Sequence, residues 1–166
     1  MKESYIFLKL FLKSKEMNIV FKGGMGSFLL FHLLYFFFLI YNEKNDTLPS
    51  YSINEEIDNN NKILNDIEIV ELNKIMNNKN KDFQLGEFIL MFFYFYGLLF
   101  DYNKYGFQFK GEDKYEIITK NITNNELLVK NINHPNIVIG TKCSNYSSIK
   151  NLFKDTFIFI RDKIRN

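Results

Sequence analysis

The feature that most constrains this fold is an apolar run that directly follows a glycine-rich turn. Three glycines lie within residues 23–26, Ser27 follows, and residues 28–41 carry scarcely a polar side chain. Glycine permits positive φ angles, and serine is a favoured N-cap residue. The pattern predicts a helix that is capped by Ser27, runs to about residue 41 and is apolar on all sides.

Such a helix has two interpretations, a membrane span or the central helix of a bundle. The run is as short as the shortest helices that cross about 30 Å of hydrocarbon. His32 lies in its middle, and Glu87 stands near the start of the other strongly apolar segment, residues 84–100. These polar groups favour a buried central helix. A small membrane protein with spans near 25–41 and 85–100 stays the less favoured alternative.

The rest of the chain predicts a mostly α fold in one domain over residues 1–166. Residues 2–17 have the pattern of an amphipathic helix with Lys9 and Lys13 on one face. A polar loop follows the apolar helix, over residues 42–60. Further helices are predicted at 62–76, 84–100 and 147–164. Two or three short strands are predicted among 105–109, 115–119 and 126–132.

Composition narrows the possible functions only a little. The chain is 46% hydrophobic, enough for a packed core, and its net charge of +2 is too small to argue nucleic-acid binding from the total. A single cysteine, Cys143, excludes an internal disulfide and a multi-cysteine zinc site. With only two histidines, His32 and His134, a metal cluster is not expected either.

Residues 9–34, KLFLKSKEMNIVFKGGMGSFLLFHLL, resemble the central-domain signature of non-templated terminal nucleotidyltransferases, the nuclear RNA-surveillance poly(A) polymerases. That signature has a helix with a lysine and often a second basic residue one turn on. Leu-Asn and Gly-Gly-Leu-(Gly/Ser)-(Gly/Ser)-(Tyr/Phe) follow. The matching residues here are Lys9, Lys13, Met17-Asn18 and Gly23-Gly24-Met25-Gly26-Ser27-Phe28, with methionine twice in place of leucine.

Two later segments are similar to the same family in the same order. Residues 85–109 resemble the poly(A)-polymerase-associated segment, and residues 127–157 resemble its closing stretch. The matching residues are Leu85, Gly86, Phe92, Phe93, Tyr96, Gly97, Phe100 and Tyr102, then Asn136, Gly140, Ile149, Lys150 and Phe153. Asn133 and His134 stand where the family has Asp before Pro. The resemblance implies a helical bundle of the poly(A) polymerase substrate-binding type.

The resemblance also implies a nucleotide site. Lys9 and Lys13 would bind the phosphates of ATP, Ser27 would contact a phosphate or cap the helix, and Phe28 would stack on the base. Gly23 and Gly24 would let the backbone approach the ligand, and Asn136 is a weaker candidate for reading the base. A helix N-terminus with nearby lysines suits a triphosphate.

Each role has a structural alternative. The lysines can be a solvated helix face, Ser27 a plain cap and Phe28 a staple across the glycine turn. His32 is expected to be a core histidine with its hydrogen bonds satisfied.

By resemblance, the activity is addition of poly(A) to RNA 3′ ends in the nucleus, in a surveillance complex with a helicase and a zinc-knuckle RNA-binding protein. In the family, two Mg²⁺ ions are held by carboxylates of a palm that precedes the segment matched here. No Asp-x-Asp occurs in this sequence. We therefore expect a central and associated region without the catalytic palm, which binds nucleotide but does not transfer it alone. The alternative is a non-enzymatic remnant that docks RNA or protein.

Overall fold

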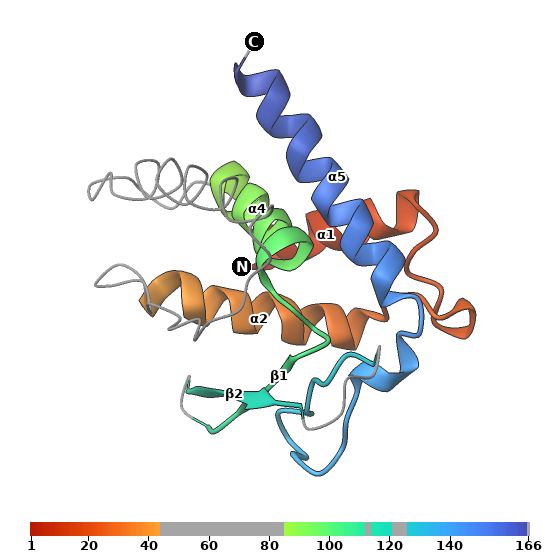
Figure 1. The fold of residues 1–166 in the computed structure, drawn as a ribbon, viewed down its shortest axis with the longest axis vertical. Coiled ribbons are helices and arrows are strands. Elements are labelled where there is room, and N and C mark those ends of the chain that lie inside the picture. The colour runs from red at the N-terminus through yellow and green to blue at the C-terminus, as the bar shows by residue number, and fades with distance from the viewer. Residues whose placement is uncertain (44–84, 112–113, 121–125, 166) are drawn as a thin grey trace, which may run out of the picture.

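The computed structural model describes residues 1–43, 85–111, 114–120 and 126–165. Its elements in chain order are α1 Lys2–Ser14, η1 Val20–Lys22, α2 Ser27–Glu43, α4 Leu85–Tyr94, the π-helical η2 Phe95–Leu99, β1 Tyr105–Phe109, β2 Tyr115–Thr119, η3 Gly140–Lys142 and α5 Tyr146–Arg165 (Figure 1). The predicted helix at 62–76 and most of the loop at 42–60 lie outside the described residues. Residues 42–43 belong to α2.

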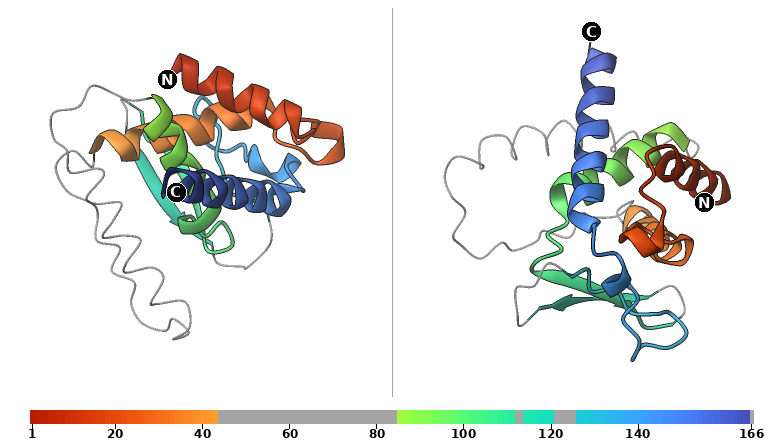
Figure 2. Two further views of the ribbon diagram at one scale, coloured as in Figure 1. Left: turned by 90° about the horizontal axis from the view of Figure 1, so that it is seen from above. Right: turned by 90° about the vertical axis from the view of Figure 1, so that its right-hand side faces the viewer.

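Helix α2 is the central layer of the described fold. In Figures 1 and 2 it runs between the β1–β2 sheet on one side and helices α1 and α4 on the other. Phe36 stacks on Phe107 of β1 with ring centroids 3.9 Å apart, and Phe37 lies 5.1 Å from Phe88 of α4. Neighbours on both sides explain why the helix has no polar face.

This arrangement agrees with the predicted central helix of a bundle. Among the described helices, none is both long enough and apolar enough to cross a membrane.

Within the described residues the sheet is a single antiparallel pair, in register from Tyr105 opposite Thr119 to Phe109 opposite Tyr115. Both of these strands were predicted. The third candidate, residues 126–132, forms only isolated bridges: Phe107 pairs with Val129, and Lys130 pairs with Val138. Because the chain turns back after Lys130, the segment bonds to β1 over too short a length to become a strand.

Helix α1 is amphipathic as predicted but ends at Ser14 instead of residue 17. Glu16 has a φ of 56°, in the left-handed region, and the Met17 N–H donates to the Leu12 carbonyl at 2.9 Å. Left-handed backbone cannot continue a helix. The other apolar segment also differs from the prediction, because its last turn, η2, is π-helical.

Candidate nucleotide-binding site

The glycine turn is held by contacts of its own backbone. Gly23 has a φ of 79°, and its carbonyl accepts a 2.9 Å hydrogen bond from the Asn145 N–H. A β-carbon on Gly24 would lie 2.6 Å from the Met17 carbonyl oxygen. Both glycines are buried, so close backbone packing is sufficient reason for glycine at each position. Their contact with a nucleotide stays a prediction.

The turn fixes where α2 begins. The Leu30 N–H donates to the Gly26 carbonyl at 3.0 Å, so Gly26 is the N-cap and Ser27 is the first helical residue. The predicted cap at Ser27 is therefore wrong by one position, and at Gly26 an added β-carbon would lie 3.0 Å from Val20 Cγ2. Ser27 is exposed on the first turn, where backbone N–H groups lack partners within the helix and the helix dipole is positive.

Tyr5 connects α1 to this end of α2. Its hydroxyl donates to the Ser27 carbonyl at 3.2 Å, and its ring meets Phe31 edge-on with centroids 6.5 Å apart. Lys9, one turn further along α1, places Nζ 6.0 Å from the centroid of the Tyr5 ring. Lys9 and the Ser27 carbonyl thus contact the same tyrosine, one at its ring and the other at its hydroxyl. Lys13, one more turn along, is also exposed.

Phe28 is half-exposed and lies against a buried histidine. Its ring meets His32 edge-on, with centroids 4.4 Å apart, and His32 is 0% exposed. His32 Nε2 accepts a 3.1 Å hydrogen bond from the Ile132 N–H, while Nδ1 lies 2.9 Å from the Phe28 carbonyl oxygen. Since one nitrogen accepts and the other faces a carbonyl, the ring is neutral with the proton on Nδ1. The expectation of a satisfied core histidine is confirmed.

Asn136 lies in the hairpin of residues 131–137. The Asn131 N–H donates to the Ile137 carbonyl at 2.9 Å and closes the hairpin, in which Asn136 is exposed. Because Ile132 bonds to His32, the hairpin and Phe28 meet at the same histidine.

Contacts through Tyr5 and His32 thus connect parts of the chain that carry four predicted site residues. These residues are Lys9, Ser27, Phe28 and Asn136. Neither of these connecting residues was predicted to have a role in the site. Tyr5 stands one helical turn before Lys9, and this local spacing could have indicated its role from the sequence. The bond between His32 and Ile132 joins residues 100 positions apart, and no local spacing indicates it.

Burial lowers the pKa of His32, and the hydrogen bond to the Phe28 carbonyl opposes this only in part. The folded state therefore binds fewer protons at this site than the unfolded state. We expect stability to fall as the pH decreases below about 6.5, the ordinary pKa of histidine. The loss continues down to the lowered folded pKa, at no more than about 1.4 kcal/mol per pH unit from this group.

Urea unfolding at a series of pH values from about 7.5 to 5 measures this effect. The matched control is His32→Gln, which does not titrate in this range but whose amide oxygen can accept from Ile132. The steeper decline of the unaltered protein should be absent in this variant. Parallel pH profiles would contradict the assignment.

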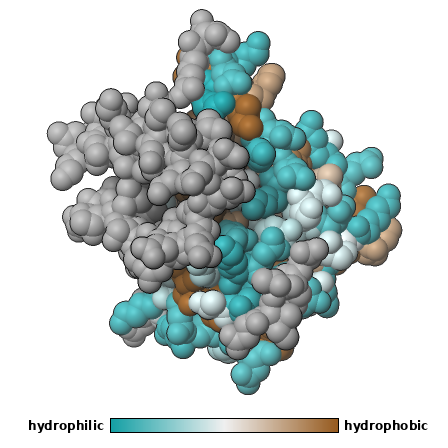
Figure 3. Space-filling model, in the orientation of Figure 1, coloured by the Kyte–Doolittle hydropathy of each residue, from teal (hydrophilic) through white to brown (hydrophobic). Residues whose placement is uncertain are grey.

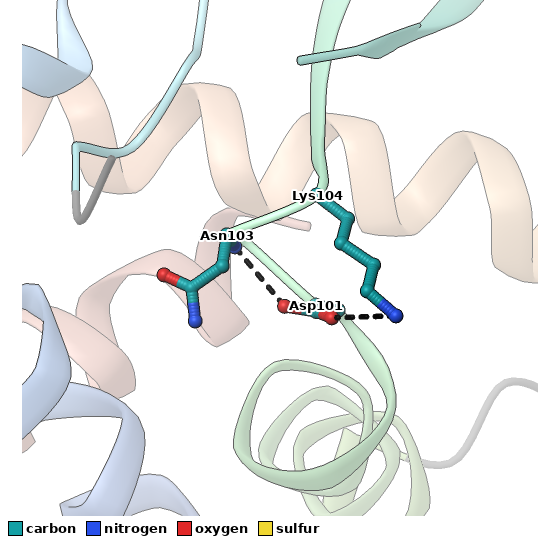
Figure 4. Close-up of polar contacts among 3 residues, drawn as sticks. All are labelled: Asp101, Asn103 and Lys104. Carbon is teal, nitrogen blue, oxygen red and sulfur yellow. Dashed lines mark hydrogen bonds and ion pairs between the residues drawn. The ribbon is translucent and has the colours of Figure 1, made fainter. Parts of the chain in front are cut away.

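A second polar cluster shapes the entry to β1 (Figure 4). Asp101 Oδ1 accepts a 3.1 Å hydrogen bond from the Asn103 N–H, and its Oδ2 lies 3.9 Å from Lys104 Nζ. Lys150 of α5 places Nζ 5.4 Å from the centroid of the Tyr102 ring, and burial lowers the pKa of Lys150. These contacts account for the turn before β1, and none of the predicted site residues takes part in them.

The described residues were also searched for groups that could bind a metal ion and for a reactive thiol. Within the ranges that the structure describes, no three His, Cys, Asp or Glu side chains are grouped so that they could hold a metal ion. These described residues therefore do not fit the two Mg²⁺ ions that the resemblance implies. Burial raises the pKa of the Cys143 thiol to about 12, so it stays protonated and unreactive near neutral pH.

Comparison with known proteins identifies the fold. No protein-family model matches the chain, and no curated protein matches it. Among solved structures, a polymerase core has a similar fold. That structure is the polymerase core of TRAMP, a RNA surveillance complex, with a TM-score of 0.61 and 20% sequence identity. The similarity covers 93% of this chain and 41% of that chain. The predicted mostly α fold with short strands is confirmed.

Proposed function

We propose that this chain is the nucleotide- and RNA-binding portion of a template-independent polynucleotide adenylyltransferase. The observation that carries the proposal is that Tyr5 contacts both Lys9 of α1 and the Ser27 carbonyl in the first turn of α2. A triphosphate at this place would meet lysine ammonium groups and the N–H groups of a helix N-terminus. Lys13 would add a second ammonium group one helical turn away.

The base of ATP would lie between Phe28 and the 131–137 hairpin. Half of the Phe28 side chain is exposed, which leaves ring surface for stacking. The Asn136 amide offers both a donor and an acceptor, as the edge of a nucleobase requires. In this proposal the exposed residues bind, and the buried glycines and His32 hold them in place.

Nucleotidyl transfer itself would need the catalytic palm of the family, whose carboxylates hold Mg²⁺. Mg²⁺ held by that palm would supply positive charge to offset the charge of the phosphates. The proposed contribution of the chain is to bind and orient ATP and an RNA 3′ end. The likeness to a polymerase core in a RNA surveillance complex supports a nuclear surveillance setting, with a helicase and a zinc-knuckle protein as proposed partners.

ATP binding measured by titration calorimetry tests the proposal. Lys9→Ala and Lys13→Ala should each weaken binding about tenfold, the loss typical of one charge-assisted hydrogen bond. Lys163→Ala is the matched control, because it removes an exposed lysine from the far end of α5, which extends away from α1 and α2 (Figure 1). The proposal fails if ATP does not bind or if all three variants lose affinity equally.

A docking scaffold is the second candidate, and exposed apolar side chains favour it. On the face drawn in Figure 3, hydrophilic residues cover most of the described surface, and hydrophobic residues form small groups. Phe21 is 88% exposed, and Ile6, Phe7 and Leu10 are exposed on α1. Binding of an RNA oligonucleotide that does not depend on ATP, with no binding of ATP itself, would support the scaffold.

A further inference from the structure

We infer that His32 is a positioning residue that fixes the 131–137 hairpin relative to Phe28 and thereby sets how the nucleotide base is bound. This inference rests on the proposed function. It assigns a role to a side chain that would itself contact neither base nor phosphate.

The imidazole connects two distant parts of the chain with its two nitrogens. Nδ1 is bonded to the Phe28 carbonyl on α2, and Nε2 accepts from the Ile132 N–H in the hairpin. Aromatic rings surround it: Phe28 at 4.4 Å, Phe31 at 5.9 Å and Phe109 at 5.8 Å between centroids. A fully buried ring with both nitrogens engaged and three aromatic neighbours has little freedom to turn.

The Ile132 side chain packs against the core, a bridge from Lys130 to Val138 closes the base of the hairpin, and the bond from Ile132 to His32 ties the hairpin to α2. Among the described residues, the other hydrogen bonds of residues 131–137 stay inside the hairpin, such as Asn131 to Ile137 and Ile137 to His134. Residues 133–137 are all exposed. Internal bonds preserve the shape of a hairpin but do not orient it. The bond from Ile132 to His32 therefore links the orientation of Asn136 to the position of Phe28.

Two amide substitutions separate positioning from bulk packing. In His32→Gln, the amide group reaches the place of Nε2 and can accept from Ile132. In His32→Asn, the shorter side chain reaches only the place of Nδ1. It can therefore keep the hydrogen bond to the Phe28 carbonyl but cannot accept the hydrogen bond from the Ile132 N–H of the hairpin. Both variants are uncharged and buried in the same aromatic surroundings. Ile132→Pro removes the same hydrogen bond from the hairpin side and replaces His32→Asn if that variant does not fold.

The test compares the dissociation constants of ATP and inorganic tripolyphosphate, which has no base. We expect His32→Asn to raise the dissociation constant of ATP about tenfold, which is the order of one lost base-stacking contact. The dissociation constant of tripolyphosphate should change less than about twofold in His32→Asn. His32→Gln should bind both ligands with the same dissociation constants as the unaltered protein. Amide hydrogen exchange at Ile132 should become faster in His32→Asn only.

The possible outcomes separate the two claims. If the unaltered protein binds ATP and His32→Asn leaves the ratio of the two constants unchanged, the inference is overturned and the proposed function stands. Equal loss for ATP and tripolyphosphate overturns it as well, because that result indicates a general structural defect. If the unaltered protein binds neither ligand, the proposed function itself fails, and this inference fails with it.

Discussion

Gly97→Ala is expected to destabilise the fold by about 3 kcal/mol, the upper part of the range for overpacking a core. An added β-carbon would lie 2.5 Å from the Lys154 nitrogen, 2.8 Å from the Lys154 α-carbon and 3.0 Å from the Phe153 carbonyl carbon. These atoms belong to the backbone of α5, which cannot rotate away as a side chain can. Urea unfolding followed by far-UV circular dichroism measures the loss.

Gly86→Ala is the matched control in the same apolar segment. Gly86 is exposed near the start of α4, and a β-carbon there meets no atom within 4 Å. Alanine has the higher helix propensity, so this substitution should stabilise the protein by up to about 1 kcal/mol. The two changes are chemically identical and should have opposite signs. A similar effect of both would show that α5 does not approach Gly97 as closely as described.

Much of the secondary structure could be predicted because long apolar runs and short alternating runs are bounded by clear breaks. The helices at 27–41 and 147–164 and the strands at 105–109 and 115–119 are confirmed with small shifts. The end of α1 was missed because Glu16, not glycine, adopts the positive φ. The π-helical turn η2 carries no periodic signal of its own within five residues.

Only part of the candidate site could be predicted from the sequence. Lys9 and Phe28 belong to a local motif, and local spacing is visible in one sequence. Gly23 and Gly24 look like ligand-contacting residues, and the structure adds a packing reason for glycine at both positions that depends on Asn145 and Met17. The hydrogen bond from Ile132 to His32 depends on how α2 and the hairpin meet in three dimensions. A single sequence does not specify such long-range pairing.

Phe36→Ala should destabilise the protein by about 3–5 kcal/mol, as for other fully buried phenylalanines. The side chain is 0% exposed and lies in the middle of the layers. Its ring stacks on Phe107 of the sheet, and Phe95 lies 6.3 Å away on the helical side. Alanine would leave a cavity whose walls belong to different elements, and rigid helices and strands close such cavities poorly. Urea unfolding gives the change in free energy.

Phe159→Ala is the control for this prediction. Phe159 is 64% exposed on α5, so its removal should change the free energy of unfolding by less than about 0.5 kcal/mol. Equal losses from both substitutions would contradict the central position of α2.

The Phe36 variant also tests whether the layers support the site. Phe107 pairs with Val129, and the chain then enters the 131–137 hairpin. A weaker contact between Phe36 and Phe107 should therefore loosen the hairpin as well as the sheet. Amide exchange at Ile132 should become faster in Phe36→Ala under conditions where the protein is still folded. In Phe159→Ala it should remain slow, because α5 holds that side chain outside the contacts that link α2 to the hairpin.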